Sequence, residues 1–340
     1  MQFAMAFKII GVLLILFSSA MLPSLFLSVI SQDGIESAFA IGFGATLAAG
    51  ILLWLPNRLR RRDLNIRDGF LVTALFWIVL GLFGAIPLWI TPQLDLSPIA
   101  AIFESISGLT TTGATVITGL DALPRSLLLY RQLLQWLGGI GIIVLAVAIL
   151  PMLGIGGMQL YRAESAGPSK DRKLTPRITS TAKALFGIYL LLTVACALSY
   201  FAAGMSPFDA LCHAFSTVAI GGFSTHDESI GFFNNPLVML IAMIFMLVSA
   251  INFALHFTVV RSRSLSTYFG DTEVKAFMVF MLLVITIAIT VLAVWEAYPS
   301  SGQTILHGAF QVISIGTTTG FTTTGFHWWP SFLPVLLIIM

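Results

Sequence analysis

The sequence contains few charged residues and almost no cysteine. Asp, Glu, Lys and Arg make up only 9% of its 340 residues, and Cys occurs twice. A soluble domain is about one-quarter charged, so the shortage of charge excludes a water-soluble globular enzyme. The apolar content excludes a disordered chain, and the shortage of Cys excludes a disulfide-rich secreted protein. A net charge of only +2 provides no basic field for nucleic acid.

The sequence is instead rich in long apolar runs, since 57% of its residues are hydrophobic. Several runs reach the roughly 20 residues that a helix needs to cross a bilayer. The strands of a membrane barrel are shorter than these runs. We therefore predict an all-α integral membrane protein. The predicted spanning helices lie near 5–30, 37–56, 68–91, 126–150, 180–204, 235–260 and 275–296, with a shorter stretch at 332–340.

Three shorter apolar segments lie between these runs, at 98–109, 207–218 and 304–315. A helix of about a dozen residues is roughly 18 Å long, about half the hydrocarbon thickness. This length predicts re-entrant half-helices. Nearly all basic residues then fall on one side, provided that the N-terminus is cytoplasmic and each short segment enters and leaves at the outer face.

The short segments belong to an internal repeat. The first copy is SPIAAIFESISGLTTTGAT (97–115), the second is SPFDALCHAFSTVAIGGFS (206–224), and the third is FQVISIGTTTGFT (310–322). Three parallel copies of helix, half-helix, Thr/Gly loop and helix follow. The predicted divisions are an N-terminal two-helix hairpin with its basic loop (1–66), pore repeat 1 (67–150), a cytoplasmic loop (151–178), pore repeat 2 (179–263) and an incomplete pore repeat 3 (264–340).

The loop after each half-helix is the predicted chemical centre. Ser-Pro pairs at 97–98 and 206–207 are typical helix starts, so the negative end of each half-helix dipole points into the membrane and favours a cation. Glycine permits backbone angles that turn successive carbonyls toward one axis, as in potassium filters. The residues before each glycine vary, and Ile220 lacks a polar side chain. We therefore predict a site built from main-chain oxygens.

These loops, with WLGGIGIIVLAVAILPMLGIGGMQLYRAE (136–164) and GPSKDRKLTPRI (167–178), closely resemble the TrkH family of the Trk, Ktr and HKT superfamily of potassium transporters. The resemblance covers essentially the whole chain. It implies a pseudo-fourfold pore, a homodimer in the bacterial inner membrane, and a cytoplasmic nucleotide-binding regulatory subunit, TrkA. The segments 151–178 and 261–275 are then candidates for the TrkA docking face.

The resemblance also implies the site residues. Gly at position 113, rather than Ser, resembles the potassium-selective branch. No cofactor, transition-metal site or catalytic residue is implied, with potassium as the substrate. The implied potassium-binding carbonyls belong to Thr111, Thr112, Ile220, Gly221, Thr318 and Thr319, the filter glycines are Gly113, Gly222 and Gly320, and further lining comes from Thr110, Ala219 and Thr317.

The family pattern contains a fourth repeat, whereas this sequence stops at Met340 within the third. We therefore expect a C-terminally truncated form, and the function predicted here is that of the intact parent.

Several other residues allow two interpretations of their structural role. Glu104 and Arg131 either form an ion pair that braces the first half-helix or face a hydrated outer vestibule. His213 and Gln311 share the repeat position of Glu104, which favours hydrogen-bonding braces over a proton relay. The cluster Gly138, Gly139 and Gly141 marks either a close helix contact or a hinge.

Two rival functions remain beside potassium uptake. A secondary transporter of another ion or small solute typically has inverted repeats, whereas these repeats are parallel. An intramembrane enzyme needs converging catalytic groups, and no such set is visible in the sequence. Both channel-like conduction and proton- or sodium-coupled symport are compatible with the predicted layout.

Overall fold

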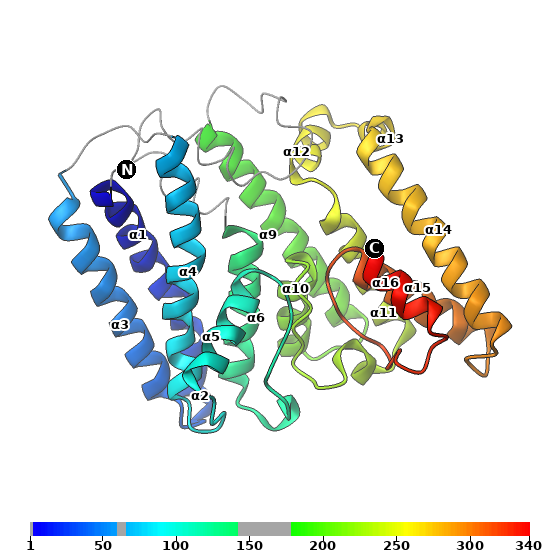
Figure 1. Cartoon of the computed structure of the whole chain (residues 1–340), viewed down its shortest axis with the longest axis horizontal. Coiled ribbons are helices and arrows are strands. Elements are labelled where there is room, and N and C mark those ends of the chain that lie inside the picture. The colour runs from blue at the N-terminus through cyan, green and yellow to red at the C-terminus, as the bar shows by residue number, and fades with distance from the viewer. Residues whose placement is uncertain (1–2, 60–65, 142–177) are drawn as a thin grey trace. The chain divides into compact units, whose positions relative to one another are not determined.

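The structure is a computed structural model that describes residues 3–59, 66–141 and 178–340, and helices joined by turns and loops make up this part of the chain (Figure 1). Within it, five helical stretches are long and apolar enough to cross a membrane, or six when a bent pair is included. The predicted all-α membrane class is therefore confirmed. The five stretches are Ala4–Ser31, Glu36–Asn57, Leu71–Ile90, Lys183–Ala202 and Thr272–Val294.

The described part of the chain forms two compact units, and the first contains the described residues within 1–110, 114–118 and 122–187. Its half-helix α5 packs between α4 and α6, and α1 packs against α3. The buried core is apolar and includes Ile10, Phe39 and Leu127. The elements are α1 (Phe3–Ser18), η1 (Ser19–Met21), α2 (Leu22–Ser31), α3 (Glu36–Trp54), η2 (Leu55–Asn57), α4 (Ile66–Ile90), α5 (Pro98–Leu109) and α6 (Arg125–Gly139).

The second unit contains residues 111–113, 119–121 and 188–340, and α9 (Ile178–Ala202) enters it from the first. Its half-helix α15 packs against α11 and α14. The helix α14 exposes large apolar side chains such as Val279 and Leu282, as a lipid-facing helix does. The other elements are η3 (Leu120–Ala122), α10 (Pro207–Val218), η5 (Ser229–Phe233), α11 (Pro236–Ala250), α12 (Phe253–Ser262), α13 (Ser266–Gly270), α14 (Thr272–Val294), α15 (Ser301–Gly316) and α16 (Phe332–Ile339).

The half-helices begin at the residues that the capping signals predict. Helix α5 spans Pro98–Leu109 and α10 spans Pro207–Val218, and the hydroxyls of Ser97 and Ser206 accept N–H bonds from their first turns. These two predictions are confirmed. The third half-helix starts three residues earlier than expected because Ser300 caps it through Gln303 N. No Ser-Pro pair marks that start in the sequence.

The prediction of one continuous helix at 235–260 is wrong, because two helices occupy this segment. Helices α11 and α12 meet at a bend of 91°, at Ile251 and Asn252. Ile251 is extended, and the Asn252 side chain accepts the N–H of Ala254 and caps the second helix. Asn252 was the available signal, because it is a favoured N-cap residue inside an apolar run.

Two other predicted segments lie partly or wholly outside the described residues. Helix α6 ends at Gly139, and the remainder of the predicted helix 126–150 is described only as far as residue 141. Nearly all of the loop 151–178 also lies outside the described part of the chain.

Candidate functional site

Each half-helix ends at the residue expected to begin a filter loop. The C-terminal caps of α5, α10 and α15 are Thr110, Ala219 and Thr317. These three residues occupy equivalent positions in the repeat. The negative end of each half-helix dipole therefore borders its loop directly.

The second and third loops begin with the same hydrogen-bonded cap. In the second, Gly221 N–H donates to Ser216 O at 2.9 Å and Ile220 N–H donates to Thr217 O at 3.1 Å. In the third, Thr319 N–H donates to Ser314 O at 2.8 Å, and Thr318 N–H bonds the Ile315 carbonyl in the same way. This is the Schellman pattern, which uses the loop N–H groups and leaves the loop carbonyls available.

The residue after each cap has a left-handed backbone although it is not glycine. Thr111, Ile220 and Thr318 have φ of 54°, 55° and 64°. Glycine normally fills this position, and a β-branched residue there costs about 1–2 kcal/mol. The same strained conformation occurs at three equivalent positions, so the repeat requires it.

A second left-handed residue follows two positions later in every loop. It is the predicted filter glycine, with φ of 76° at Gly113, 78° at Gly222 and 84° at Gly320. In an extended strand, successive peptide groups face opposite sides. In each of the three loops, two left-handed residues separated by one residue interrupt the alternating direction of the peptide groups.

The three loops meet within the second unit. A Cβ atom built on Gly113 would lie well inside 3.0 Å of the Gly221 carbonyl oxygen, and one on Gly222 would lie as close to the Thr319 carbonyl oxygen. Loop 1 therefore contacts loop 2, and loop 2 contacts loop 3, through predicted site residues. At Gly320, such a Cβ would have no described atom within 4 Å beyond those of the glycine itself and its two neighbours in the chain.

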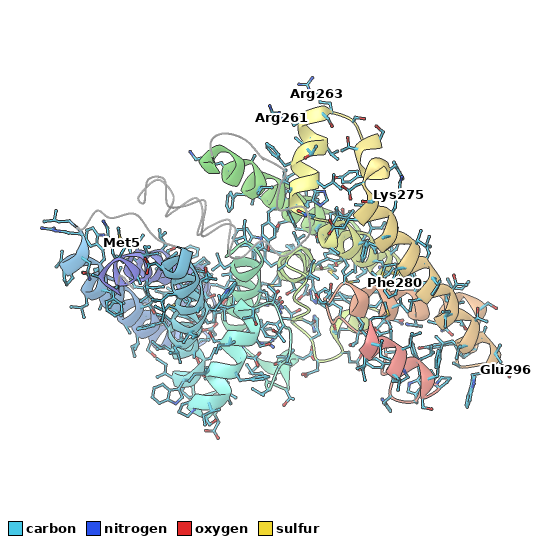
Figure 2. All side chains as sticks on the ribbon, turned by 45° about the horizontal axis from the view of Figure 1, so that its top comes forward. Met5, Arg261, Arg263, Lys275, Phe280 and Glu296 are labelled. Atoms are coloured by element: carbon cyan, nitrogen blue, oxygen red, sulfur yellow. The ribbon has the colours of Figure 1, made fainter. Side chains whose placement is uncertain are left out.

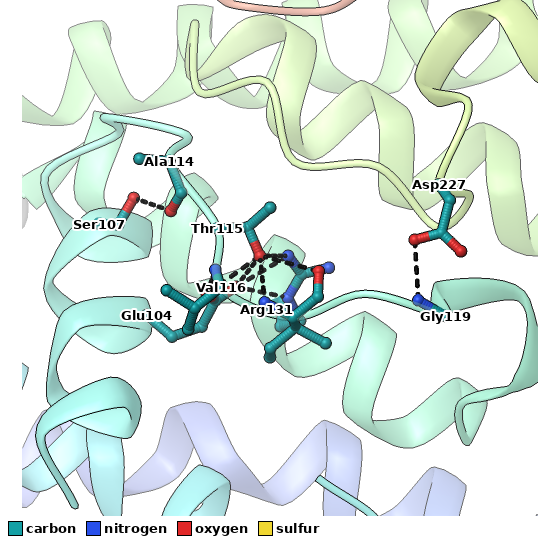
Figure 3. A network of polar contacts seen from close by, with 9 residues as sticks. Glu104, Ser107, Ala114, Thr115, Val116, Gly119, Arg131 and Asp227 are labelled. Carbon is teal, nitrogen blue, oxygen red and sulfur yellow. Dashed lines mark hydrogen bonds and ion pairs between the residues drawn. The ribbon is translucent and has the colours of Figure 1, made fainter. Parts of the chain in front are cut away.

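Loops 1 and 3 are also tied back to their own half-helices by a serine. Ser107 Oγ donates to the Ala114 carbonyl at 2.6 Å, as Figure 3 shows, and Ser314 Oγ donates to the Phe321 carbonyl at 2.7 Å. The two serines align in the repeat, and each bonds the residue directly after the predicted filter glycine. These bonds fix the backbone on the C-terminal side of each of these two glycines.

The structure brings Glu104 and Arg131 together in the first unit. Arg131 Nη2 lies 2.8 Å from Glu104 Oε1, and both side chains are buried. The carboxylate also accepts the Val116 N–H at 3.0 Å and the Thr115 hydroxyl at 2.9 Å (Figure 3). Because Thr115 and Val116 follow Gly113 closely in the chain, this buried pair fixes the outgoing half of loop 1.

The residues aligned with Glu104 form braces of a different kind. His213 Nε2 lies 2.9 Å from Ser224 Oγ, and Gln311 Nε2 donates to the Thr324 carbonyl at 3.2 Å. Each bonds the segment after the predicted filter glycine of its own loop. The contacts therefore favour the brace reading over a proton relay.

Gly138 of α6 is a close helix contact. A Cβ there would lie well inside 3.0 Å of the Leu109 carbonyl oxygen, at the last residue of α5. The contact lies immediately before loop 1. Close packing is thus the reading that the geometry supports for Gly138.

A group of residues that follow the first and second loops was missed by sequence reasoning. The Asp227 carboxylate accepts the N–H groups of Gly119 and Leu120, and His226 Nδ1 bonds Asp121. The available signal was the pair His226-Asp227 directly after the second loop. Its partner lies more than 100 positions away in the sequence, so no local pattern reveals it.

Comparisons with known proteins agree with this architecture. The family model TrkH, described as a cation transport protein, matches residues 35–340. The Trk system potassium uptake protein TrkH of Halomonas elongata is 55% identical over 339 residues, which cover 100% of this chain and 70% of the relative. The protein of the same name from Escherichia coli K12 is 52% identical over 338 residues, covering 99% of this chain and 70% of that protein.

A solved structure is similar throughout this chain. It is the crystal structure of the potassium transporter TrkH from Vibrio parahaemolyticus, with a TM-score of 0.88 and 48% sequence identity. The similarity covers 100% of this chain and 69% of that one. The family-model match and the identities above 50% along the whole sequence show that the chain belongs to the TrkH family of cation transport proteins.

Proposed function

We propose that the chain forms the pore of a Trk-type potassium uptake system in the bacterial inner membrane, with a selectivity filter of main-chain carbonyl oxygens. The observation that carries the proposal is the shared loop geometry. Three equivalent loops have left-handed residues at the same two positions, and they contact one another through their glycines and carbonyls.

The chemistry of these loops supports a dehydrated monovalent cation as the ligand. Carbonyl oxygens replace the water shell of potassium in known filters. In loops 2 and 3 the N–H groups are bonded back to the half-helices, so the main chain presents acceptors. The negative ends of the half-helix dipoles add to the attraction. We assign the ligands to the carbonyls of Thr111, Thr112, Ile220, Gly221, Thr318 and Thr319.

The proposed ring has four members, as the family resemblance implies. Loops 1, 2 and 3 are neighbours in that order, and the free side of Gly320 is the side on which a fourth loop would pack. The pseudo-fourfold pore is therefore part of the proposal.

The distribution of charge in the second unit supports a cytoplasmic location for the end of this unit at which α14 starts. Arg261, Arg263 and Lys275 lie at one end of this unit, near the start of α14, while Glu296 lies at the other end of the same helix (Figure 2). Basic residues collect on the cytoplasmic side of membrane proteins. We further propose that this basic end contacts a TrkA subunit and that the protein is a homodimer.

The test is rubidium or potassium uptake by bacterial cells that lack their own potassium uptake systems and express the full natural protein. We expect saturable uptake that excess sodium does not inhibit. Transport of an organic solute or of sodium in preference to potassium would contradict the proposal and favour a secondary transporter.

Gly113→Ser tests the assignment of the filter itself. Its new side chain would meet the Gly221 carbonyl and displace one of the proposed ligands. We expect discrimination against sodium to weaken while protein yield in the membrane is retained. Unchanged selectivity would contradict the placement of the filter at these loops.

A further inference from the structure

We propose that Asp227 is a positioning residue for ion selection, because its carboxylate ties filter loop 1 to filter loop 2 at the outer mouth. The proposal rests on the proposed function, since it concerns the selectivity of the same loops. Asp227 has no counterpart among the site residues predicted from the sequence, and it lies five residues after Gly222.

The contacts of Asp227 use both carboxylate oxygens. Oδ1 accepts the N–H of Gly119 at 3.0 Å, and Oδ2 accepts the N–H of Leu120 at 3.0 Å. Figure 3 shows the first of these bonds. Hydrogen bonds to an ionised acceptor are stronger than neutral ones. Two such bonds to adjacent amides fix both the position and the orientation of the loop 1 backbone.

A reciprocal contact strengthens the same link. The Asp227 N–H approaches Asp121 Oδ2 at 3.4 Å, and Asp121 also bonds His226 Nδ1. The segment 119–121 thus donates two N–H groups to loop 2 and offers it a carboxylate in return. The positive charge that His226 acquires on protonation offsets the repulsion between the two acidic side chains.

Loop 2 is joined to loop 3 just beyond Asp227. Ser229 Oγ accepts the Thr322 N–H at 3.2 Å, and the Gly231 N–H donates to the Thr322 carbonyl at 3.1 Å. The segment 227–231 therefore contacts both neighbouring loops. The link from this segment to loop 1 uses the side chains of Asp227 and Asp121, and of the two only Asp227 bonds the loop 1 backbone.

The position of this link explains why it would affect selectivity. The start of the outgoing stretch of loop 1 is held by Ser107 and Glu104, which belong to the same repeat. Its far end, at Gly119 and Leu120, is held by Asp227 from the next repeat. Loss of the Asp227 hydrogen bonds leaves the backbone at Gly119 and Leu120 less constrained. This backbone belongs to the stretch that starts at Gly113. A filter discriminates between cations through the arrangement of its oxygens, so this freedom reduces discrimination.

An exposed carboxylate at a pore mouth has an alternative role, which is to attract cations through its charge. The neighbouring Glu228 separates the two roles. Both side chains are exposed and acidic, but Glu228 makes no capping hydrogen bond to the backbone. Glu228→Gln thus removes the same charge one residue away without removing a bond between loops.

The experiment compares Asp227→Asn, Asp227→Ala and Glu228→Gln in the full protein, using rubidium uptake with and without competing sodium. Asparagine replaces one carboxylate oxygen with an NH2 donor, which faces an N–H group, so the paired contact through both oxygens is lost. We expect the rubidium-to-sodium preference to fall by at least about threefold in Asp227→Asn, and further in Asp227→Ala. We expect Glu228→Gln to keep the wild-type preference. The amount of folded protein in the membrane is measured for every variant.

Two results would overturn the inference. The first is an unchanged ion preference in both Asp227 variants, with or without a loss of protein, which would make the residue merely structural. The second is an equal rise in KM for all three variants without a change in preference, which would assign Asp227 to cation attraction. Failure of the wild type to take up rubidium would instead contradict the proposed function itself.

Discussion

The carbonyl oxygen of Thr319 occupies the space that a side chain at Gly222 would need. This contact joins the second loop to the third, and Gly222 has a φ of 78°. Both the space and the backbone angle therefore require glycine at this position. The first prediction follows from this contact.

We expect Gly222→Ala to lower both potassium uptake and the discrimination against sodium, as Gly113→Ser does, because overpacking and an unfavourable φ act together. The measurement is rubidium uptake normalised to protein in the membrane. Gly302→Ala is the matched control, since Gly302 lies in the first turn of α15 with open space around it. Normal uptake by Gly222→Ala would contradict the close approach of the loops.

The main-chain character of the site predicts different outcomes for two substitutions of Ile220. Ile220→Gly relieves a left-handed isoleucine with a φ of 55°, so we expect uptake to be retained and stability to rise by about 1 kcal/mol. Ile220→Pro fixes φ near −65° and removes the N–H that bonds Thr217. We expect this variant to lose uptake. Equal uptake by the two variants would show that the backbone angle at Ile220 is unimportant.

The buried pair Glu104 and Arg131 predicts strong coupling. We expect Glu104→Gln and Arg131→Leu each to lower the free energy of unfolding by about 3 kcal/mol, since each leaves a buried charge without its partner. The double variant should lose about 2 kcal/mol less than the sum. The measurement is a double-mutant cycle of thermal stability in detergent. Additive losses would show that the two side chains act independently.

The contact of Gly138 with the end of α5 predicts a loss of stability on substitution. We expect Gly138→Ala to destabilise the protein by about 1–3 kcal/mol, because the added methyl group meets the Leu109 carbonyl. Gly187→Ala in α9 is the control, since the space around that residue is open. A hinge at Gly138 would instead leave stability near that of the wild type and alter the rate of transport.

The pair of His226 and Asp121 predicts a dependence of stability on pH. Partial burial lowers the pKa of His226, but the carboxylates of Asp209 and Asp121 offset this and leave it above the usual 6.5. The hydrogen bond from His226 holds the pKa of Asp121 below the usual 3.8. Both side chains are therefore charged at pH values between the lowered pKa of Asp121 and the raised pKa of His226.

The stability from His226 is present below its ordinary pKa and is lost as the pH rises through the raised value. The stability from Asp121 is lost only as the pH falls below 3.8 toward its lowered pKa. His226 also faces Asp209, at 3.5 Å, and the ring of His213. Because the pair is partly exposed, we expect the Tm to fall by only about 1–2 °C between pH 6 and pH 9. His226→Gln should remove this difference, and an unchanged pH profile would refute the ion pair.

Local sequence signals determined much of the architecture. Apolar runs of spanning length predicted the membrane class, and the Ser-Pro pairs at 97–98 and 206–207 placed the starts of α5 and α10 correctly. These features depend on residues a few positions apart, such as a hydroxyl and the N–H three residues later. The repeat of Thr/Gly loops likewise identified Gly113, Gly222 and Gly320 as equivalent, and their φ values agree within 8°.

The tertiary structure decided what depends on distant parts of the chain. The 91° bend at Ile251, the left-handed isoleucine at position 220 and the bond from Gly119 to Asp227 have no strong local signature. An isolated chain would avoid a left-handed isoleucine, because that conformation is strained. It persists here because equivalent loops contact one another and their N–H groups are bonded back to the half-helices. Spacing along the sequence identified the loops, whereas only folding brought their carbonyls together.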